Sequence, residues 1–187
     1  MIAGVFLDRD GVLNRERPDY VKGWDEFQWL PGVMPALARL AKLGCPIAVL
    51  TNQSAIGRGL VSTATVAAIH RRMQAEVAAA GGRIDAFFVC PHHPDDGCDC
   101  RKPKPGLLRQ AAAHFQLDLA QCVFIGDSIT DAQAAYAVYC ASVLVQSGRQ
   151  GPNLPSLLPP ALQDVPIVPD LAAAVAWLFD KESVAIE

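Results

Sequence analysis

Residues 4–14, GVFLDRDGVLN, set the architecture of the chain and raise its main chemical question. The apolar half of this stretch is typical of a buried β-strand, and the strand ends where Asp8 and Asp10 follow two positions apart. Side chains alternate along a strand, so both carboxylates point to one side if the extended geometry continues to residue 10. Two adjacent carboxylates repel each other unless a cation or a shared proton offsets the repulsion. The stretch therefore predicts a buried strand that leads directly into a charged site.

Further apolar runs repeat the strand pattern, and alanine-rich segments with helical spacing lie between them. The expected helices cover residues 33–44, 62–82, 105–115, 130–138 and 170–181, and Pro105 takes a first-turn position. Apolar strands that alternate with helices are typical of a parallel sheet covered on both faces, which is a three-layer α/β/α fold of the Rossmann kind. Residues 147–165, rich in Gly, Pro and Ser, predict a surface loop. The expected strands are 2–7, 46–51, 86–90, 122–126, 141–145 and 165–169.

The bulk composition limits the classes of function. A chain of 187 residues is long enough for one well-buried domain, and we expect a single domain over 1–187. The formal net charge of −3 argues against nucleic-acid binding by bulk electrostatics. The opening run MIAGVFL meets a charge at Asp8, too early for a signal peptide or a membrane span. We expect a cytoplasmic monomer with a small-molecule substrate and no membrane or nucleic-acid partner.

Polar residues lie at or just beyond the carboxyl ends of four expected strands: Asp8, Thr51, Cys90 and Asp127. Ligands bind at this edge of an open parallel sheet, so these side chains should meet on one rim. Mg²⁺ would offset the charges of Asp8 and Asp10, and Asp127 would add an oxygen from a neighbouring strand end. The alternative is that Asp8 and Asp10 only cap a turn.

Four motifs then carry a resemblance that covers residues 2 to about 145. FLDRDGVLN, VLTN, RKPKPG and GDSITD occur in the order found in phosphohydrolases of the haloacid-dehalogenase superfamily, and the chain resembles that superfamily. The resemblance implies that Asp8 is the nucleophile and forms an aspartyl-phosphate, while Asp10 protonates the leaving alcohol and then activates water. It also implies Mg²⁺ held by Asp8, the main-chain carbonyl of Asp10 and Asp127.

The same resemblance assigns the groups that hold the phosphoryl oxygens. These are the Thr51 hydroxyl, the Asn52 amide and the Lys102 ammonium. Asp131 has two equal interpretations: it orients Lys102 or the metal shell, or it is an ordinary aspartate at the start of a helix.

The stretch CPHHPDDGCDCRKPKPG predicts a second metal site. It has the form C-x-H-x5-C-x-C, and Cys90, His92, Cys98 and Cys100 make a Cys₃His set for structural Zn²⁺ in a loop over residues 90–101. His93 is the competing ligand, and the spacing favours His92. Redox-active or merely buried cysteines are the alternative. We expect the zinc loop to turn Arg101 and Lys102 toward the phosphate site.

The remaining cysteines and histidines have structural interpretations. Cys45, Cys122 and Cys140 lie in apolar runs and should be core residues. His70 and His114 lie on expected helices without partners nearby in sequence, and we expect surface or packing roles for both.

Residues 11–32 leave room only for a flap, so the enzyme should lack a cap domain and recognise its substrate through short loops. Those loops resemble the ones in phosphatases of D-glycero-D-manno-heptose 1,7-bisphosphate, which remove the 7-phosphate on the way to lipopolysaccharide core precursors. In this group, Arg101 would bind the second phosphate, and Arg58 is a further candidate. The implied substrate contacts are Asp8, Arg9, Asp10, Glu16, Tyr20, Thr51, Asn52, Gln53, Ser54, Arg101 and Lys102.

The chain departs from this group at three places, none of them in the chemical core. Ser128 stands where relatives often have a lysine, and Ala55 replaces a frequent glycine. The segment NRERPDY is one residue longer than in some members, which leaves the alignment of Glu16 open.

Three alternative functions compete with this interpretation. Histidinol-phosphate phosphatases share the motifs and the zinc loop, although Tyr20, Val21 and the GRG turn favour heptose. A phosphosugar-binding scaffold would have lost Asp8, Asp10, Lys102 or Asp127, and all four are present. A nucleic-acid 3′-phosphatase would need a basic stripe, which the sequence lacks.

Overall fold

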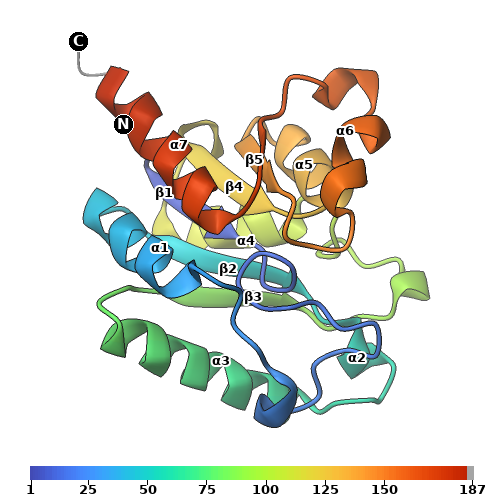
Figure 1. Cartoon of the computed structure of the whole chain (residues 1–187). Coiled ribbons are helices and arrows are strands. Elements are labelled where there is room, and N and C mark those ends of the chain that lie inside the picture. Colours follow the sequence, from blue (N-terminus) through green and yellow to red (C-terminus); the bar gives the residue numbers. More distant parts are fainter. Residues whose placement is uncertain (185–187) are drawn as a thin grey trace.

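The protein is described by a computed structural model over residues 1–184; the last three residues of the expected domain lie outside the described part. Within residues 1–184 the chain forms a six-stranded parallel sheet in the order β3-β2-β1-β4-β5-β6 (Figure 1). This confirms the expected sheet and all of its strands. The strands are β1 (Gly4–Leu7), β2 (Ile47–Asn52), β3 (Ala86–Cys90), β4 (Cys122–Gly126), β5 (Ala141–Val145) and β6 (Ile167–Val168).

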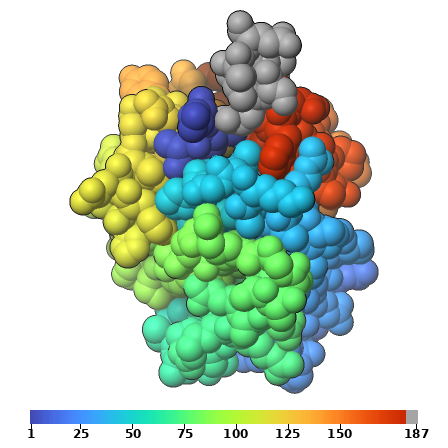
Figure 2. Space-filling model, turned by 90° about the vertical axis from the view of Figure 1, so that its left-hand side faces the viewer, coloured from blue at the N-terminus to red at the C-terminus, as the bar shows by residue number. Residues whose placement is uncertain are grey.

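Helices cover both faces of the sheet, which confirms the three layers. The helices are α1 (Val33–Leu40), α2 (Ser54–Gly57), α3 (Thr63–Ala79), α4 (Gly106–Phe115), α5 (Ile129–Tyr136), α6 (Leu154–Leu157) and α7 (Leu171–Val184). One face carries α1, α3 and α7, and the other carries α4 and α5. Figure 2 shows the segments that carry α1 (light blue) and α3 (green) as neighbours on the surface of the molecule.

The alternation of side chains along β1 divides the core between these two layers. Val5 and Leu7 pack into the cluster beneath α1, α3 and α7, whereas Phe6 packs into the cluster beneath α4 and α5. All three side chains are fully buried, because β1 is central and covered on both sides. A strand with both faces buried has polar groups only at its ends, so Asp8 marks the point where the chain leaves the core.

Local residues set the helix ends, with one correction. Ser62 caps α3 by accepting a hydrogen bond from the Thr65 backbone N–H at 3.0 Å. Gly44 has φ of +75° and ends the turn 41–43 after α1, as glycine does at a helix C-terminus. Pro105, expected in the first turn, instead occupies the N-cap of α4.

The expected surface loop 147–165 is more ordered than its composition predicts. It contains two 3-10 turns, at 151–153 and 160–162, with α6 between them. Leu154 and Leu162 are buried in a small cluster with Leu144 of β5 and Ala132 of α5. These leucines anchor the segment, because burying each of them removes a large apolar surface from water.

The flap over residues 11–32 is tied to α3 by an aromatic cluster. Trp24 stacks on Phe27 with ring centroids 4.6 Å apart, and Phe27 meets Trp29 edge-on at 4.9 Å. Trp29 Nε1 donates to Glu76 Oε2 on α3 at 2.9 Å. Within residues 1–184, the segment between β1 and α1 is therefore a packed loop and not a separate cap domain.

No helix among residues 1–184 is long and apolar enough to span a membrane.

The packing of α1 on the sheet yields a stability prediction. Leu37 is fully buried between α1 and the sheet, so Leu37→Ala should lower the free energy of unfolding by about 2–5 kcal/mol. Leu157 on α6 is 46% exposed, and the control Leu157→Ala should change it by less than about 0.5 kcal/mol. Urea unfolding followed by circular dichroism measures both. Equal losses in the two variants would contradict the described core.

Candidate active site

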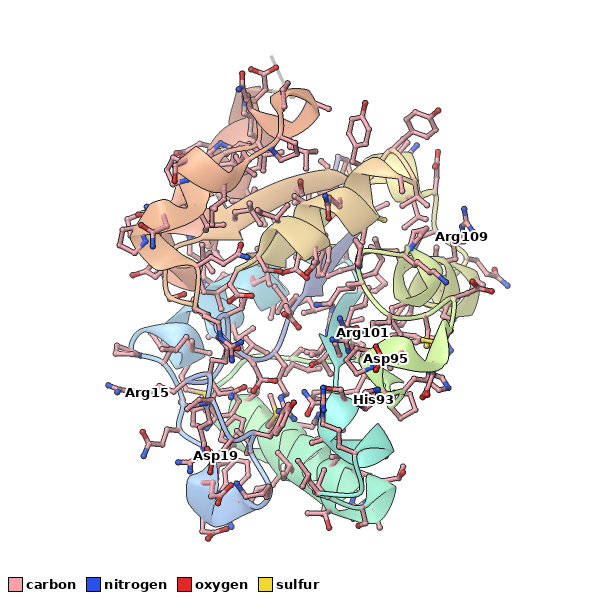
Figure 3. All side chains as sticks on the ribbon, turned by 90° about the vertical axis from the view of Figure 1, so that its right-hand side faces the viewer. Arg15, Asp19, His93, Asp95, Arg101 and Arg109 are labelled. Carbon is pink, nitrogen blue, oxygen red and sulfur yellow. The ribbon has the colours of Figure 1, made fainter. Side chains whose placement is uncertain are left out.

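A cavity of about 380 Å³ lies at the carboxyl ends of β1, β2 and β4. Figure 3 shows Arg101 turned inward over the middle of this face, while Arg15 and Arg109 point outward. The sequence-predicted substrate and magnesium residues are thus brought together on one rim. Its lining includes Asp8, Arg9, Asp10, Glu16, Tyr20, Thr51, Asn52, Gln53, Ser54, Arg58, Arg101, Lys102 and Asp127.

Lys102 is the centre of the charged network at the bottom of the cavity. Its ammonium lies 2.9 Å from Asp8 Oδ1 and 2.7 Å from Asp131 Oδ1, and it donates to the Leu50 carbonyl at 3.1 Å. The side chain is 4% exposed. Burial opposes the charge, but Asp131 and Asp8 outweigh it and raise the pKa of Lys102. Lys102 is therefore a fixed cation next to the expected nucleophile.

The carboxylates outnumber this cation. Burial raises the pKa of Asp8 to about 7, against the opposing effect of Lys102. Burial, followed by the charges of Asp131 and Asp8, also raises the pKa of Asp127 well above its usual range. Asp8, Asp127 and Asp131 each turn an oxygen to within 4.8 Å of the others. Oxygen ligands in such a group suit a divalent cation such as Mg²⁺, which would relieve the repulsion.

Asp131 fits both of its proposed interpretations. Its Oδ1 pairs with Lys102, which is the orienting role. Its Oδ2 accepts from the Asp127 and Ser128 backbone N–H groups at 3.2 and 3.1 Å and from Ser128 Oγ at 2.8 Å, which is the helix-start role. Ser128 and Asp131 form a capping box on α5, so the serine at the departing position stabilises this helix.

Asp10 is held differently from Asp8. Burial alone would raise the pKa of Asp10. The charge and hydrogen bonds of Arg9, followed by the hydrogen bonds of Asn14 and Gln53, outweigh burial and lower this pKa. The Arg9 guanidinium donates to both carboxylate oxygens, at 3.1 and 2.9 Å, and it is 1% exposed. Asn14 Nδ2 and Gln53 Nε2 donate at 2.9 and 2.8 Å. Asp10 is therefore an immobilised carboxylate, and Arg9 lines the cavity with its guanidinium already engaged.

The second motif connects the two halves of the site. Gln53 Nε2 also donates to Thr51 Oγ1 at 2.8 Å, which joins Thr51 to Asp10. The Asn52 side chain exchanges hydrogen bonds with the backbone of Lys102, both at 3.2 Å. Asn52 thus fixes the position of Lys102 as well as lining the cavity.

The residues predicted to bind zinc form a compact cluster. Cys90 Sγ lies 3.7 Å from Cys98 Sγ and 3.6 Å from His92 Nδ1. Cys100 Sγ lies 3.6 Å from Cys98 Sγ and 3.2 Å from His92 Nδ1. Zn–S bonds of about 2.3 Å give tetrahedral S···S edges of about 3.8 Å, which matches these separations. The cluster therefore has the donors and the size that Zn²⁺ requires.

The competing histidine has another function. His93 Nδ1 accepts from the Asp95 backbone at 3.3 Å and caps the 3-10 turn 94–96. Burial, followed by the neighbouring sulfurs, raises the pKa of Cys100 to about 12. Burial also raises the pKa of Cys90, against the opposing hydrogen bond from the His92 backbone. A bound Zn²⁺ would displace protons from such thiols.

The other cysteines and histidines divide between core and surface. Cys45, Cys122 and Cys140 are buried, as predicted. His114 lies exposed on α4, edge-on to Phe88 and Phe115. His70, in contrast, is buried and contacts Arg9, a partner that sequence distance concealed.

Sequence reasoning missed part of the cavity wall. Arg149 pairs with Glu16, with Nη2 2.8 Å from Oε1, and both line the cavity together with Arg17. Arg149 lies four residues beyond the end of β5, so the strand-end rule used for the other residues could have found it. Arg101 Nη1 is buried and has no hydrogen-bond partner among residues 1–184. These arginines add positive charge to the cavity lining, which suits an anion.

The parallel sheet, the Asp8–Lys102–Asp131 network and the motif order define a class of protein. The family model for haloacid dehalogenase-like hydrolases matches residues 5–138, and the chain belongs to this family.

The names of its relatives describe a more specific activity than the family does. The chain is 47% identical over 175 residues to the D-glycero-beta-D-manno-heptose-1,7-bisphosphate 7-phosphatase of Pseudomonas aeruginosa, covering 94% of this chain and 97% of that one. It is 43% identical over 154 residues to the corresponding alpha-anomer phosphatase of Mycobacterium tuberculosis, covering 79% and 81%. The crystal structure of the D,D-heptose 1,7-bisphosphate phosphatase of B. bronchiseptica, complexed with magnesium and phosphate, matches with a TM-score of 0.89 at 43% identity, over 96% and 99% of the two chains.

The excess of carboxylates predicts a pH-dependent response to Mg²⁺. At a concentration about 100 times its dissociation constant at pH 8, Mg²⁺ should raise the free energy of unfolding at that pH by about 2.7 kcal/mol. The same concentration should give a smaller gain at pH 5.5. Below a pH of about 7 the Asp8 carboxyl holds a proton that the ion must displace. Thermal unfolding at both pH values, without chelator, measures it. Equal gains at the two pH values, or a full gain in Asp127→Asn, would contradict this magnesium site.

Proposed function

We propose that the protein removes the 7-phosphate from D-glycero-D-manno-heptose 1,7-bisphosphate through an aspartyl-phosphate on Asp8. The observation that carries this proposal is the charge of the cavity lining. The carboxylates around Lys102 line the cavity together with Arg17, Arg58, Arg149 and Arg101, whose Nη1 has no hydrogen-bond partner among residues 1–184. A substrate with two phosphates would place one beside Lys102 and the other among these arginines. The activities of the relatives from Pseudomonas aeruginosa and Mycobacterium tuberculosis support this substrate.

The first step is attack by an Asp8 carboxylate oxygen on the phosphorus of the 7-phosphate. A P–O bond to Asp8 forms, and the bond from phosphorus to the sugar oxygen breaks. Lys102, 2.9 Å from Asp8, favours the ionised form of the nucleophile against the effect of burial and offers its charge to the phosphoryl oxygens, together with the Thr51 hydroxyl. Mg²⁺, held by Asp8, Asp127 and the Asp10 main-chain carbonyl, would neutralise phosphate charge so that an anionic nucleophile can approach.

Asp10 carries the protons. In the structure it accepts four hydrogen bonds as a carboxylate, and the one from Gln53 comes from a residue that lines the cavity. The sugar oxygen replaces Gln53 as the partner of this carboxylate. The negative charge of an arriving phosphate raises the pKa of Asp10, so that it takes up a proton and passes it to the leaving sugar oxygen. As a carboxylate again, it takes a proton from the water that attacks the phosphorus and releases Asp8.

The arginines of the cavity lining favour a bisphosphate over histidinol phosphate. The end of histidinol phosphate that does not react carries an amine and an imidazole, and its positive charge would lie in a cavity lined by Arg58, Arg101 and Arg149. Like charges in one cavity raise the free energy of the complex, whereas a second phosphate would form charge-assisted hydrogen bonds.

We propose that the Cys₃His cluster binds Zn²⁺ with a structural role. Its loop, residues 90–101, carries almost no apolar core, and it ends directly at Arg101 and Lys102. A metal there would fix the backbone that presents both cations to the substrate. Reduced thiols suit the cytoplasm, where we place this reaction on the route to lipopolysaccharide core precursors or related glycans.

Substrate preference tests the proposed function. With Mg²⁺, kcat/KM for the α- or β-anomer of heptose 1,7-bisphosphate should exceed that for histidinol phosphate by more than about tenfold, which corresponds to about 1.4 kcal/mol of transition-state binding. Arg101→Met should lower kcat/KM for the bisphosphate about 10- to 100-fold, because a charged hydrogen bond is lost. Arg109 is exposed and points outward, so Arg109→Met is the matched control and should behave like the wild type (Figure 3). A preference for histidinol phosphate would overturn the substrate assignment.

Metal analysis of two neighbouring variants tests the zinc site. The wild type should contain about one equivalent of Zn²⁺ by plasma mass spectrometry, because four donors fill a tetrahedral site. His92→Asn should lose most of this zinc and unfold at a lower temperature. His93→Asn removes only a cap and should keep the metal. Loss of zinc from the His93 variant alone would contradict the ligand assignment.

A further inference from the structure

Arg9 lies between the two aspartates of the first motif and is the largest fully buried side chain among residues 1–184. Its Nε and Nη2 atoms donate to the two oxygens of Asp10, at 3.1 and 2.9 Å. A planar guanidinium that donates to both oxygens fixes the plane of the carboxylate as well as its position. The guanidinium therefore acts on Asp10 and is not free to bind substrate.

His70 supports Arg9 from behind. Its Nε2 lies 3.3 Å from Arg9 Nη1, and because arginine has only donors, Nε2 must be the unprotonated acceptor. Burial, followed by the charge of Arg9, lowers the pKa of His70 to about 3, which is consistent with a neutral ring. The ring stacks on Phe87 of β3, with centroids 4.1 Å apart and planes 10° apart. Figure 1 shows α3, which carries His70, running along β3.

We propose that Arg9 and His70 are positioning residues that hold the Asp10 carboxylate in line with the water that hydrolyses the aspartyl-phosphate. The inference rests on the role of Asp10 in the proposed function. His70 is absent from the cavity lining, so it acts through Arg9 and Asp10 and touches neither substrate nor metal. The order of contacts is Phe87, His70, Arg9, Asp10, which leads from the edge strand β3 to the reacting centre.

The two chemical steps depend differently on this support. In the second step, water forms a bond to phosphorus, the bond between phosphorus and Asp8 breaks, and Asp10 takes the proton of the water. This step always needs Asp10 in line. In the first step, a leaving group such as 4-nitrophenolate departs without a proton, so the alignment of Asp10 matters little. Loss of the support should therefore slow dephosphorylation more than phosphorylation for such a substrate.

The test is stopped-flow kinetics with 4-nitrophenyl phosphate and Mg²⁺. His70→Phe keeps an aromatic ring against Phe87 but removes the acceptor, whereas His70→Gln restores an acceptor near the place of Nε2. His114 also packs against aromatic rings but lies away from the cavity, so His114→Phe is the matched control. His70→Phe should lower kcat and KM together, each about tenfold, leave kcat/KM within about twofold of the wild type and show a burst of up to one equivalent of 4-nitrophenolate. His70→Gln should recover most of kcat, and His114→Phe should match the wild type without a new burst.

The outcomes separate this inference from the function on which it rests. Unchanged kcat in His70→Phe would overturn the inference. So would slower turnover without a burst, or with a lower melting temperature that His70→Gln shares, because a merely structural role predicts both. Asp10→Asn is measured in parallel. If that variant keeps wild-type turnover, the proposed role of Asp10 fails; if it is inactive while His70→Phe behaves like the wild type, only the positioning role fails.

Discussion

The site depends on one buried ammonium group. Lys102 Nζ lies between Asp8 and Asp131 and also meets the Leu50 carbonyl, so a single charge joins β1, β2 and α5. Removing one partner of a buried ion pair leaves a charge uncompensated, which costs about 3–5 kcal/mol. The Asn52 side chain holds the backbone that carries this ammonium. Asp8 is thus a structural partner of Lys102, and one of its carboxylate oxygens is the atom that we expect to attack phosphorus.

Lys102 does not lie on a strand or a helix. It comes from the loop between β3 and α4, which holds the four proposed zinc ligands. Cys90 starts this loop at the end of β3, and Asn52 at the end of β2 binds the Lys102 backbone where the loop ends. The proposed zinc site and the phosphate site are therefore mechanically linked through Arg101 and Lys102. A cation on a long side chain can only stabilise charge at a defined point when its backbone is fixed.

Much of the fold and site followed from the sequence for definite physical reasons. Apolar runs that end in Asp8, Thr51 and Asp127 mark central parallel strands, and parallel strands bring their carboxyl ends to one edge. Strand ends and short-range spacing, as in the C-x-H-x5-C-x-C loop, are local patterns that a sequence displays directly.

Contacts between segments far apart in the chain leave no such local pattern in the sequence. His70 and Arg9 lie 61 residues apart, so the helical spacing that puts His70 on the buried face of α3 with Val66 and Met73 does not reveal its partner. Arg149 belongs to a segment rich in Gly, Pro and Ser whose composition predicted a surface loop. Two leucines of that segment pack against β5 and α5, and the segment's beginning, with Arg149, lines the cavity. Asp131 had two interpretations because its two oxygens serve two partners at once.

The most direct test of this account is to trap the covalent intermediate. The enzyme would be mixed with Mg²⁺ and heptose 1,7-bisphosphate labelled with ³²P at the 7-phosphate, quenched in acid within the first turnover, and reduced with borohydride, which converts an aspartyl-phosphate to homoserine. The account predicts labelled protein before reduction and homoserine at position 8 by peptide mass spectrometry. Homoserine at position 10 or 127, or full turnover with no protein-bound label, would contradict it.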